Sequence, residues 1–184
     1  MVNMITWITV GILALIILYI VLTFNRLISL RNRVDNAWSQ IDVQLKRRYD
    51  LIPNLINSVK GYMKHEKGVL TEITKMRSQL VSGSMSQKAK ASDAISNALK
   101  TIFAVAENYP KLEASENFKM LQEELSGTES KIAFARQFYN DNVMDLNNKI
   151  QQFPSNVIAS IINFKEREFF KSEEVEKKAV KVEF

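Results

Sequence analysis

Residues 4–24 (MITWITVGILALIILYIVLTF) form an uninterrupted run of 21 residues without a charged side chain. At about 1.5 Å rise per residue, a helix of this length extends about 31 Å, which matches the hydrocarbon thickness of a bilayer. A cleaved signal peptide is the alternative interpretation, but the run lacks a preceding basic region, is too long and is followed by no small-residue cleavage site. The run therefore predicts an uncleaved membrane-spanning helix, with the lipid bilayer as a partner of the chain.

The positive charge of the chain is concentrated directly after this run. The formal net charge is +5, and residues 26–67 carry nine Lys or Arg against four Asp or Glu, so this segment accounts for the whole excess. Arg26, Arg31 and Arg33 are the first basic side chains, and the positive-inside rule places such a flank in the cytoplasm. We therefore expect a single-pass protein of the cell membrane, with the N-terminus outside and the bulk of the chain cytoplasmic. An extracytoplasmic bulk is the alternative, because long domains translocate largely regardless of charge.

The remaining chain has the composition and periodicity of helices. It contains only five glycines and three prolines, and its apolar residues recur at steps of three and four without sustained alternation. These features predict an all-α fold, in which a single N-terminal transmembrane helix continues into an antiparallel bundle of three to four long helices. We expect Pro53 to kink or restart the first helix around residues 50–54, because proline lacks the backbone donor that a helix needs.

Local signals predict where the later helices begin and end. Residues 82–87 have the composition of a linker, and a short helix is expected over residues 89–108, ended by Pro110. Ser115 is expected to cap a long helix whose apolar seam is typical of a coiled coil, and Pro154 should end it.

The last part of the chain is expected to contain one more short helix and a charged tail. Ser155 should cap a helix over residues 157–164, and the following residues alternate in charge sign, which predicts a helical stub that runs into a mobile tail. The predicted divisions are residues 1–3 as an extracytoplasmic N-terminus, 4–24 as the transmembrane helix, 26–164 as the helical bundle and 165–184 as the charged C-terminal tail.

No pattern typical of an active site or a metal centre occurs in the sequence. The chain has no cysteine and a single histidine, His65, which lacks the Glu-x-x-His pairing of a di-metal bundle and is interpreted as exposed. Glu123 and Glu124 are adjacent and point in different directions on a helix, so they form no acid–base pair. Neither G-x-x-x-x-G-K-S/T nor G-x-G-x-x-G occurs. We therefore expect no enzymatic activity, no cofactor and no metal.

Lys46, Arg47 and Arg48 form the densest basic cluster of the chain. Nucleic-acid binding would need aromatic side chains interleaved with these residues, but Trp38 and Tyr49 lie on the apolar stripe. We interpret the cluster as a solvated basic face and expect no nucleic-acid partner. The arginines that follow the apolar run are, by contrast, close enough to the bilayer to meet anionic lipid.

Polar side chains also recur along the first helix. Asp35, Asn36, Asp42, Asp50 and Asn54 are expected to pair with neighbouring helices or with a second subunit. For the last two, local capping around the proline is an equal alternative.

Residues 30–55 (LRNRVDNAWSQIDVQLKRRYDLIPNL) closely resemble the signature of the bacterial LemA family. The match continues nearly to the end of the chain, through KGY, KHE, AVAENYP, TE, AR, YN, FPSN and the terminal KVEF. The resemblance implies a single N-terminal membrane helix and a helical bundle, and the family includes proteins linked to magnetosome membrane formation. For most of the family no biochemical activity is established, so the resemblance supplies no mechanism. The residues of the first motif that we take as candidate subunit contacts are Asp35, Asn36, Trp38, Asp42, Tyr49, Pro53 and Asn54.

These observations lead to one functional hypothesis and one alternative. The leading hypothesis is a non-enzymatic, membrane-anchored helical scaffold that forms a homo-oligomer at the cytoplasmic membrane. The alternative is an adaptor that recruits another membrane protein, such as a protease, without assembling by itself.

Overall fold

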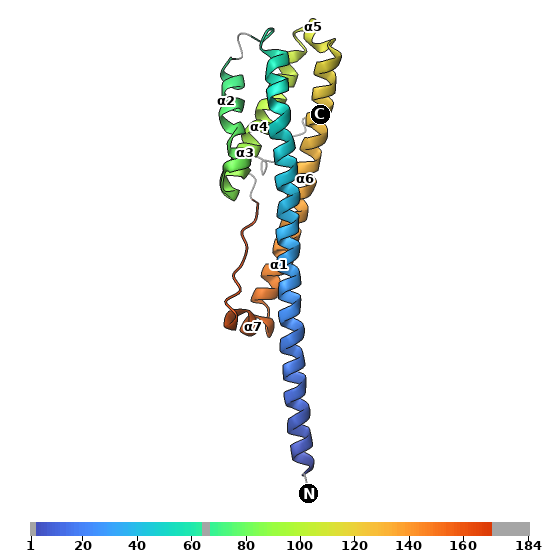
Figure 1. The fold of residues 1–184 in the computed structure, drawn as a ribbon, viewed down its shortest axis with the longest axis vertical. Coiled ribbons are helices and arrows are strands. Elements are labelled where there is room, and N and C mark those ends of the chain that lie inside the picture. Colours follow the sequence, from blue (N-terminus) through green and yellow to red (C-terminus); the bar gives the residue numbers. More distant parts are fainter. Residues whose placement is uncertain (1–2, 64–66, 171–184) are drawn as a thin grey trace, which may run out of the picture. The chain divides into compact units, whose positions relative to one another are not determined.

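The computed structural model describes residues 3–63 and 67–170, and this part of the chain contains helices and no strand (Figure 1). The helices are α1 (Met4–Val59), α2 (Lys67–Arg77), α3 (Gln79–Ser82), α4 (Met85–Ala106), α5 (Pro110–Glu113), α6 (Glu116–Gln151) and α7 (Ser155–Ile161). The prediction of an all-α fold with one long apolar N-terminal helix is confirmed. His65 and the predicted mobile end of the tail, residues 171–184, lie outside the described residues.

The chain divides into two compact units, and the long helices α1 and α6 contribute residues to both. Unit 1 contains the described residues up to Trp38 together with Phe138–Phe169. Unit 2 contains the described residues of Ser39–Gln137 together with Phe170. Each unit has its own buried apolar side chains, as the following paragraphs show.

In unit 1, one face of α1 packs against the end of α6 and against α7 (Figure 1). Trp38 on α1 meets Tyr139 on α6 edge to face, with ring centroids 5.6 Å apart. Full burial of each large apolar side chain contributes about 1.5–3 kcal/mol, so this packing is the main stabilising contribution of the unit. The buried apolar side chains are Leu27, Leu30, Val34, Ala37, Tyr139, Val143, Leu146, Ile158 and Ala159.

Hydrogen bonds fix both ends of helix α7. Ser155 was predicted to cap this helix, but its Oγ lies 2.7 Å from the carbonyl oxygen of Lys149 and therefore donates to the end of α6 instead. Asn163 has a φ of 53°, a left-handed conformation that asparagine tolerates. The N–H of Phe164 then donates to the carbonyl oxygen of Ala159 at 2.8 Å, which closes a Schellman turn. The last turn of α7 is thus completed without a glycine.

The segment after α7, residues 164–170, forms no helix. The predicted helical stub is therefore wrong for residues 165–170. The side-chain amide of Asn147 donates from Nδ2 to the carbonyl oxygen of Arg167 and accepts at Oδ1 from the Arg167 N–H, both at 2.9 Å. Tyr139 donates its hydroxyl to the carbonyl oxygen of Glu168 at 2.9 Å. Because α6 side chains satisfy these backbone groups, the segment does not need helical hydrogen bonds there.

In unit 2, the second part of α1 packs with α4 and α6, and α2 and α3 lie against α4 (Figure 1). Phe103 and Phe118 meet edge to face, with ring centroids 6.3 Å apart. The large buried apolar side chains of this unit on α1, α2, α3, α4 and α6 are Ile41, Leu45, Ile52, Leu55, Ile73, Leu80, Ile95, Leu99, Ile102, Phe118, Leu125 and Ile132.

The predicted linker over residues 82–87 is shorter than expected, because α4 starts within it. Ser84 is the N-cap of α4: its hydroxyl accepts from the Gln87 N–H, and the Gln87 side chain accepts from the Ser84 N–H. This capping box satisfies two backbone donors and moves the start of the helix to Met85. Gly83 precedes it at a tight turn, where a Cβ atom would lie 2.5 Å from the carbonyl oxygen of Gln79.

Helix α1 passes through Pro53 and ends at Val59, so of the two outcomes expected at this proline, a kink or a restart, the restart is wrong. Proline removes the donor that would bind the carbonyl oxygen of Tyr49. That oxygen accepts a hydrogen bond of 2.8 Å from Nε of Arg77 on α2. A side chain from another helix therefore replaces the missing backbone donor, and α1 continues.

Candidate functional site

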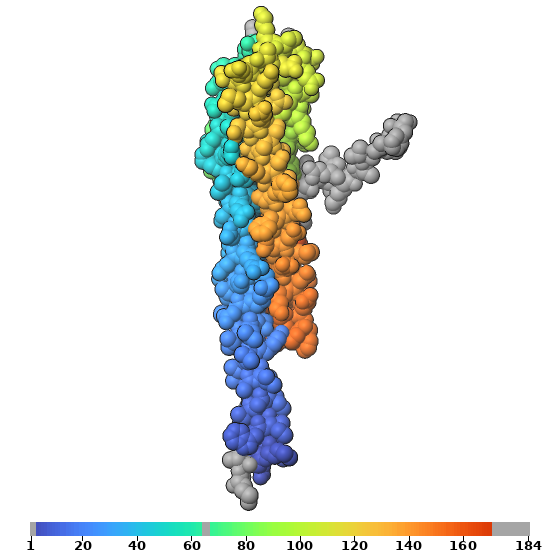
Figure 2. All heavy atoms as spheres, turned by 90° about the vertical axis from the view of Figure 1, so that its right-hand side faces the viewer, coloured from blue at the N-terminus to red at the C-terminus, as the bar shows by residue number. Residues whose placement is uncertain are grey.

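The first part of α1 is the candidate membrane-spanning segment. Among the helices of the described residues, α1 is the one that is long and apolar enough to cross a membrane. Its side chains are exposed from Met4 through Leu18, and no other described residue of unit 1 covers them (Figure 2). Burial begins at Thr23, which is 3% exposed. The sequence prediction of one apolar N-terminal helix therefore coincides with the part of unit 1 that has no protein packed around it.

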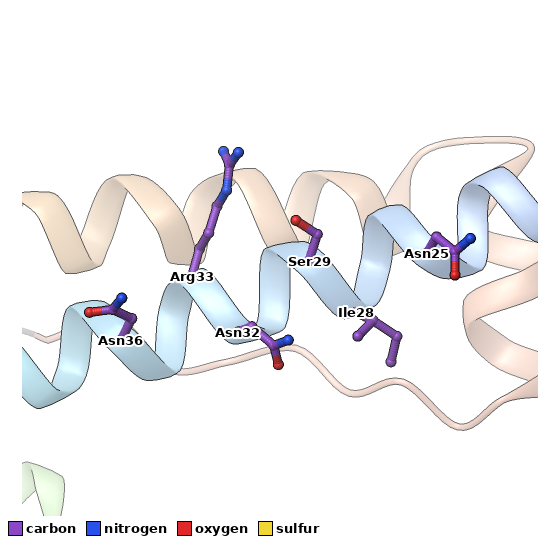
Figure 3. Close-up of a pocket in the computed structure, with 6 residues that line it drawn as sticks. All are labelled: Asn25, Ile28, Ser29, Asn32, Arg33 and Asn36. Atoms are coloured by element: carbon purple, nitrogen blue, oxygen red, sulfur yellow. The ribbon is translucent and has the colours of Figure 1, made fainter.

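The arginines predicted to flank the membrane lie on α1 just beyond this segment. Arg26, Arg31 and Arg33 are exposed, and the guanidinium of Arg31 lies 5.5 Å from the centre of the Phe164 ring. A shallow groove of about 430 Å³ follows the same stretch of α1 (Figure 3). In Figure 3 its side chains diverge: Arg33 and Ser29 extend to one side of the helix, and Ile28 and Asn32 to the other. The groove is thus an open, amide-rich surface rather than a closed binding site. It is lined by Asn25, Ile28, Ser29, Asn32, Arg33 and Asn36.

The candidate contact residues of unit 1 largely bind within the chain. Asp35 forms an ion pair of 2.8 Å with the guanidinium of Arg167. Trp38 packs on Tyr139, as described above, and burial raises the pKa of the Tyr139 phenol. Asn36 is exposed on the groove of Figure 3. The structure therefore brings Asp35 and Trp38 to the segment 164–169 and to α6, and a role of either residue at a subunit contact stays a prediction.

The candidate contact residues of unit 2 also largely bind within the chain. Asp42 pairs with Lys88 on α4 at 2.6 Å. The centre of the Tyr49 ring lies 3.7 Å from the guanidinium carbon of Arg77. The same arginine donates to the Tyr49 carbonyl oxygen, which Pro53 leaves without a helical donor. Asn54 alone among these candidates is exposed; it lies on a shallow groove of about 430 Å³ that side chains of α1 and α6 line. Neighbouring helices are thus the partners of Asp42 and Tyr49 in the structure.

Arg48 is the residue that the sequence interpretation missed. The sequence pattern predicts Arg48 as part of a solvated basic face, but its side chain is fully buried. Its Nη1 donates to the carbonyl oxygen of Ser92 at 2.9 Å, and its Nη2 pairs with the carboxylate of Glu129. The Ser96 hydroxyl in turn donates to Glu129 at 2.6 Å. Burial lowers the pKa of Arg48 below its ordinary value, and the Glu129 charge acts against this shift.

A signal for the burial of Arg48 was present in the sequence. Arg48 lies three residues after Leu45 and four before Ile52, which is the spacing of the buried stripe of α1. Lys46 and Arg47, the other members of the basic cluster, are exposed and pair with Asp50 and Glu124. The interpretation as a solvated face is therefore right for two of the three residues and wrong for the one on the stripe.

The contacts of Arg48, Ser92, Ser96 and Glu129 join α1, α4 and α6. A buried arginine must be paired and hydrogen-bonded, because an isolated buried charge is costly. Arg136 and Asp93 form a second ion pair of 2.7 Å between α6 and α4. Within the described part of the chain, no three His, Cys, Asp or Glu side chains gather in a way that could hold a metal ion.

The fold and these sites define a class of protein: a membrane-associated, all-helical protein with one candidate membrane-spanning helix at its N-terminal end. The chain belongs to the LemA family, whose profile matches residues 37–184. The resemblance seen in the sequence is confirmed.

Three relatives show how far this similarity extends. Protein LemA of Metamycoplasma hominis is 29% identical, over 83% of this chain and 71% of the relative. Magnetosome protein MamQ 2 of Paramagnetospirillum magneticum is 22% identical, over 82% of this chain and 65% of the relative. Magnetosome protein MamQ of Magnetospirillum gryphiswaldense is 21% identical with the same coverage. The chain thus spans somewhat less than two thirds of the MamQ proteins, and none of these names denotes an enzymatic activity.

Proposed function

We propose that this chain is a non-enzymatic scaffold that is anchored in the cytoplasmic membrane by α1 and self-associates through its helical domain. The proposal includes the orientation that the charge pattern predicts, with the N-terminus outside and the helical domain in the cytoplasm. Anchoring restricts the protein to a plane, so that even a weak contact between domains favours assembly. The relatives named for magnetosomes are compatible with a role at a membrane.

The observation that carries self-association is an exposed seam on α6 in unit 2. Phe134 is 73% exposed and Met120 is 64% exposed. They lie fourteen residues apart, which is two heptads, so they share one face of the helix. Gly127 lies midway between them, and a Cβ atom at this position would meet no atom within 4 Å. We call Met120, Gly127 and Phe134 the α6 seam.

The α6 seam has the properties of a helix–helix contact. Two large apolar side chains exposed on one face of a helix favour a contact with a second helix, because burying each of them is favourable by about 1.5–3 kcal/mol. A glycine between them lets a second helix approach closely. We infer that the occupant of the seam is the same seam of a second copy, since knobs at heptad spacing fit holes at the same spacing.

The first test is the mass of the full-length chain in nanodiscs or mild detergent, measured by light scattering. A discrete assembly of several copies is expected. The double variant Met120→Ser, Phe134→Ser should dissociate it while the helix content stays unchanged, because both side chains are exposed. Ser126→Asp, an exposed position on α6 about 100° around the helix from Gly127, is the matched control and should leave the assembly intact.

The second test uses the absence of native cysteine. A single cysteine at Phe134 should form a disulfide-linked dimer on oxidation in the membrane, whereas a single cysteine at Ser126 should not. A wild-type chain that is monomeric at micromolar concentration, with no cross-link at either position, would contradict self-association. In that case a stoichiometric foreign membrane protein in the purified sample would support the adaptor alternative.

A further inference from the structure

We propose that the turn before α7 and the outer face of α7 form a second membrane contact, inserted in the interfacial layer of the bilayer beside the end of the span. We call Phe153, Val157 and Ile161 the α7 face. The proposal rests on the anchoring of α1 in the membrane. The experiment below distinguishes a failure of this anchoring from a failure of the α7 face to insert.

The first observation is the exposure of these side chains. Phe153 is 82% exposed, Ile161 is 78% exposed and Val157 is about half exposed. Val157 and Ile161 are four residues apart on α7 and share one face of the helix. The opposite side of α7 is buried in unit 1 through Ile158 and Ala159. Helix α7 therefore carries apolar side chains on both sides, and the packing of unit 1 covers only one of them.

The second observation is the lack of charge. Residues 150–164 (IQQFPSNVIASIINF) contain no charged side chain, and Lys149 and Lys165 border them. A surface helix in water normally presents charged or polar residues on its outer face. An uncharged stretch with exposed Phe, Val and Ile, bordered by lysines, is instead suited to the boundary between headgroups and acyl chains.

The third observation is the level of α7 along α1, both of which belong to unit 1. Thr23 is buried although its neighbours Leu22 and Phe24 are exposed, so the packed part of unit 1 reaches the last turn of the uncharged run. Figure 1 shows α7 beside α1 at this end of the unit, with the N-terminal part of α1 continuing beyond the level of α7. When residues 4–22 occupy the hydrocarbon layer, the α7 face is therefore at the interfacial layer.

The charges at the same level favour a bilayer as the occupant rather than another protein surface. Arg26, Arg31 and Arg33 are exposed on α1, and Lys165 is exposed after α7. Basic side chains near the bilayer surface attract anionic headgroups, and this attraction falls off within a Debye length, so it is strongest for Arg26. An uncharged stretch with an exposed apolar face, bordered along the chain by Lys149 and Lys165 and next to a span, matches an interfacial helix, which buries its apolar side about 5–10 Å deep.

The test places one fluorescent probe at a time on the full chain, reconstituted in vesicles of phosphatidylcholine and phosphatidylglycerol. Ile161→Cys and Phe153→Cys carry an environment-sensitive nitrobenzoxadiazole label, which is unique because the chain has no cysteine. Phe138→Cys is the matched control: this phenylalanine is also exposed, at 48%, in unit 1, and lies about 20 Å away along α6. Leu13→Cys, in the middle of the apolar run, reports on anchoring.

We expect probes at 153 and 161 to show blue-shifted emission and to be quenched several-fold more strongly by shallow spin-labelled lipid than the probe at 138. The probe at 138 should instead be quenched by iodide in water. Replacing phosphatidylglycerol by phosphatidylcholine should weaken the lipid quenching at 161 without abolishing it. A Phe153→Ser, Val157→Ser double variant should return the probe at 161 to the aqueous emission.

Three outcomes would overturn the proposal. If the probes at 153 and 161 are as accessible to iodide as the probe at 138, while Leu13→Cys is quenched by lipid, the α7 face lies in water and only the anchoring holds. If the probe at 161 is protected from iodide but not quenched by lipid, protein covers the face. If Leu13→Cys is not quenched by lipid, the anchoring itself fails.

Discussion

Arg77 donates a hydrogen bond from Nε to the carbonyl oxygen of Tyr49 at 2.8 Å, and its guanidinium carbon lies 3.7 Å from the centre of the same residue's ring. The accepting oxygen is the one that Pro53, four residues later, leaves without a helical donor. One side chain of α2 thus satisfies the defect that proline creates in α1. The contact between Arg77 and Tyr49 therefore allows α1 to contain a proline and still pack in unit 2.

The first prediction concerns this pair. Arg77→Ala should lower the free energy of unfolding by about 1–2 kcal/mol, because the Tyr49 carbonyl loses its donor and the ring loses a cation. In a Pro53→Ala background the backbone N–H that the substitution introduces restores the helical bond, and Arg77→Ala should cost clearly less. Denaturant unfolding of the full chain in mild detergent, followed by circular dichroism, measures this double-mutant cycle. Equal costs in both backgrounds would show that the bond to Tyr49 does not compensate for the proline.

The second prediction concerns the buried arginine. Glu129→Ala should lower the free energy of unfolding by about 2–3 kcal/mol, because Arg48 would remain buried without its counter-charge. This is less than for a fully buried pair, since the Glu129 side chain is partly exposed to water. Glu124→Ala is the matched control on the same helix: it removes the partner of the exposed Arg47 and should cost less than about 1 kcal/mol.

The comparison of these two variants decides the role of the cluster. Arg48→Met should be less damaging than Glu129→Ala, because it removes the buried charge and leaves a carboxylate that water reaches. Glu129→Ala behaving like Glu124→Ala in the same unfolding experiment would show that water solvates Arg48 in solution.

The third prediction concerns pH. Burial raises the pKa of the Tyr139 phenol above its ordinary value of 10.0. The folded state then keeps its proton at a pH where the unfolded state loses it, so this contribution to stability is full below about pH 10 and is lost as pH rises through the folded pKa. A spectroscopic titration of phenolate absorbance, taken as wild type minus Tyr139→Phe, should show one tyrosine that titrates later than the ordinary value. A difference curve centred at or below pH 10 would contradict the burial of this hydroxyl.

The fourth prediction concerns the segment after α7. Asn147→Ala should speed hydrogen exchange of the Arg167 amide and proteolysis around it, because both hydrogen bonds that hold the Arg167 backbone are lost. Asn148→Ala, the adjacent exposed asparagine, should leave both rates unchanged. If the two variants behave alike, the Asn147 amide does not hold the segment, and the contacts of Tyr139 and Asp35 suffice.

The fifth prediction concerns orientation. In cells with an intact cytoplasmic membrane, a single cysteine at Ser130 should react with an impermeant maleimide only after permeabilisation. A single cysteine at Asn3 should react without it, because the residue directly before the span lies outside in the proposed orientation. The reverse pattern would establish the extracytoplasmic alternative for the helical domain.

Part of the site could be predicted from the sequence, and part could not. The stripe that contains Leu45 and Ile52 predicted which face of α1 is buried, and the same spacing includes Arg48. The spacing alone does not predict that Arg48 is buried, because a charged side chain is buried only where groups that pair with it or accept its hydrogen bonds lie nearby. Those partners, Ser92 on α4 and Glu129 on α6, are more than forty residues away along the chain, and no local sequence pattern predicts that they contact Arg48.

Features that depend on neighbours along the chain could be predicted from the order of the amino acids: the apolar run of α1, the helical periodicity, the breaks near Pro110 and Pro154 and the all-α class. These features follow from hydrogen bonds and side-chain spacing within a few residues. Three other features depend on contacts between distant parts of the chain: α1 continues through Pro53, Arg48 is buried and residues 164–170 form no helix. In each case a side chain from another helix, Arg77, Glu129 or Asn147, satisfies a polar group that local structure would have left unpaired.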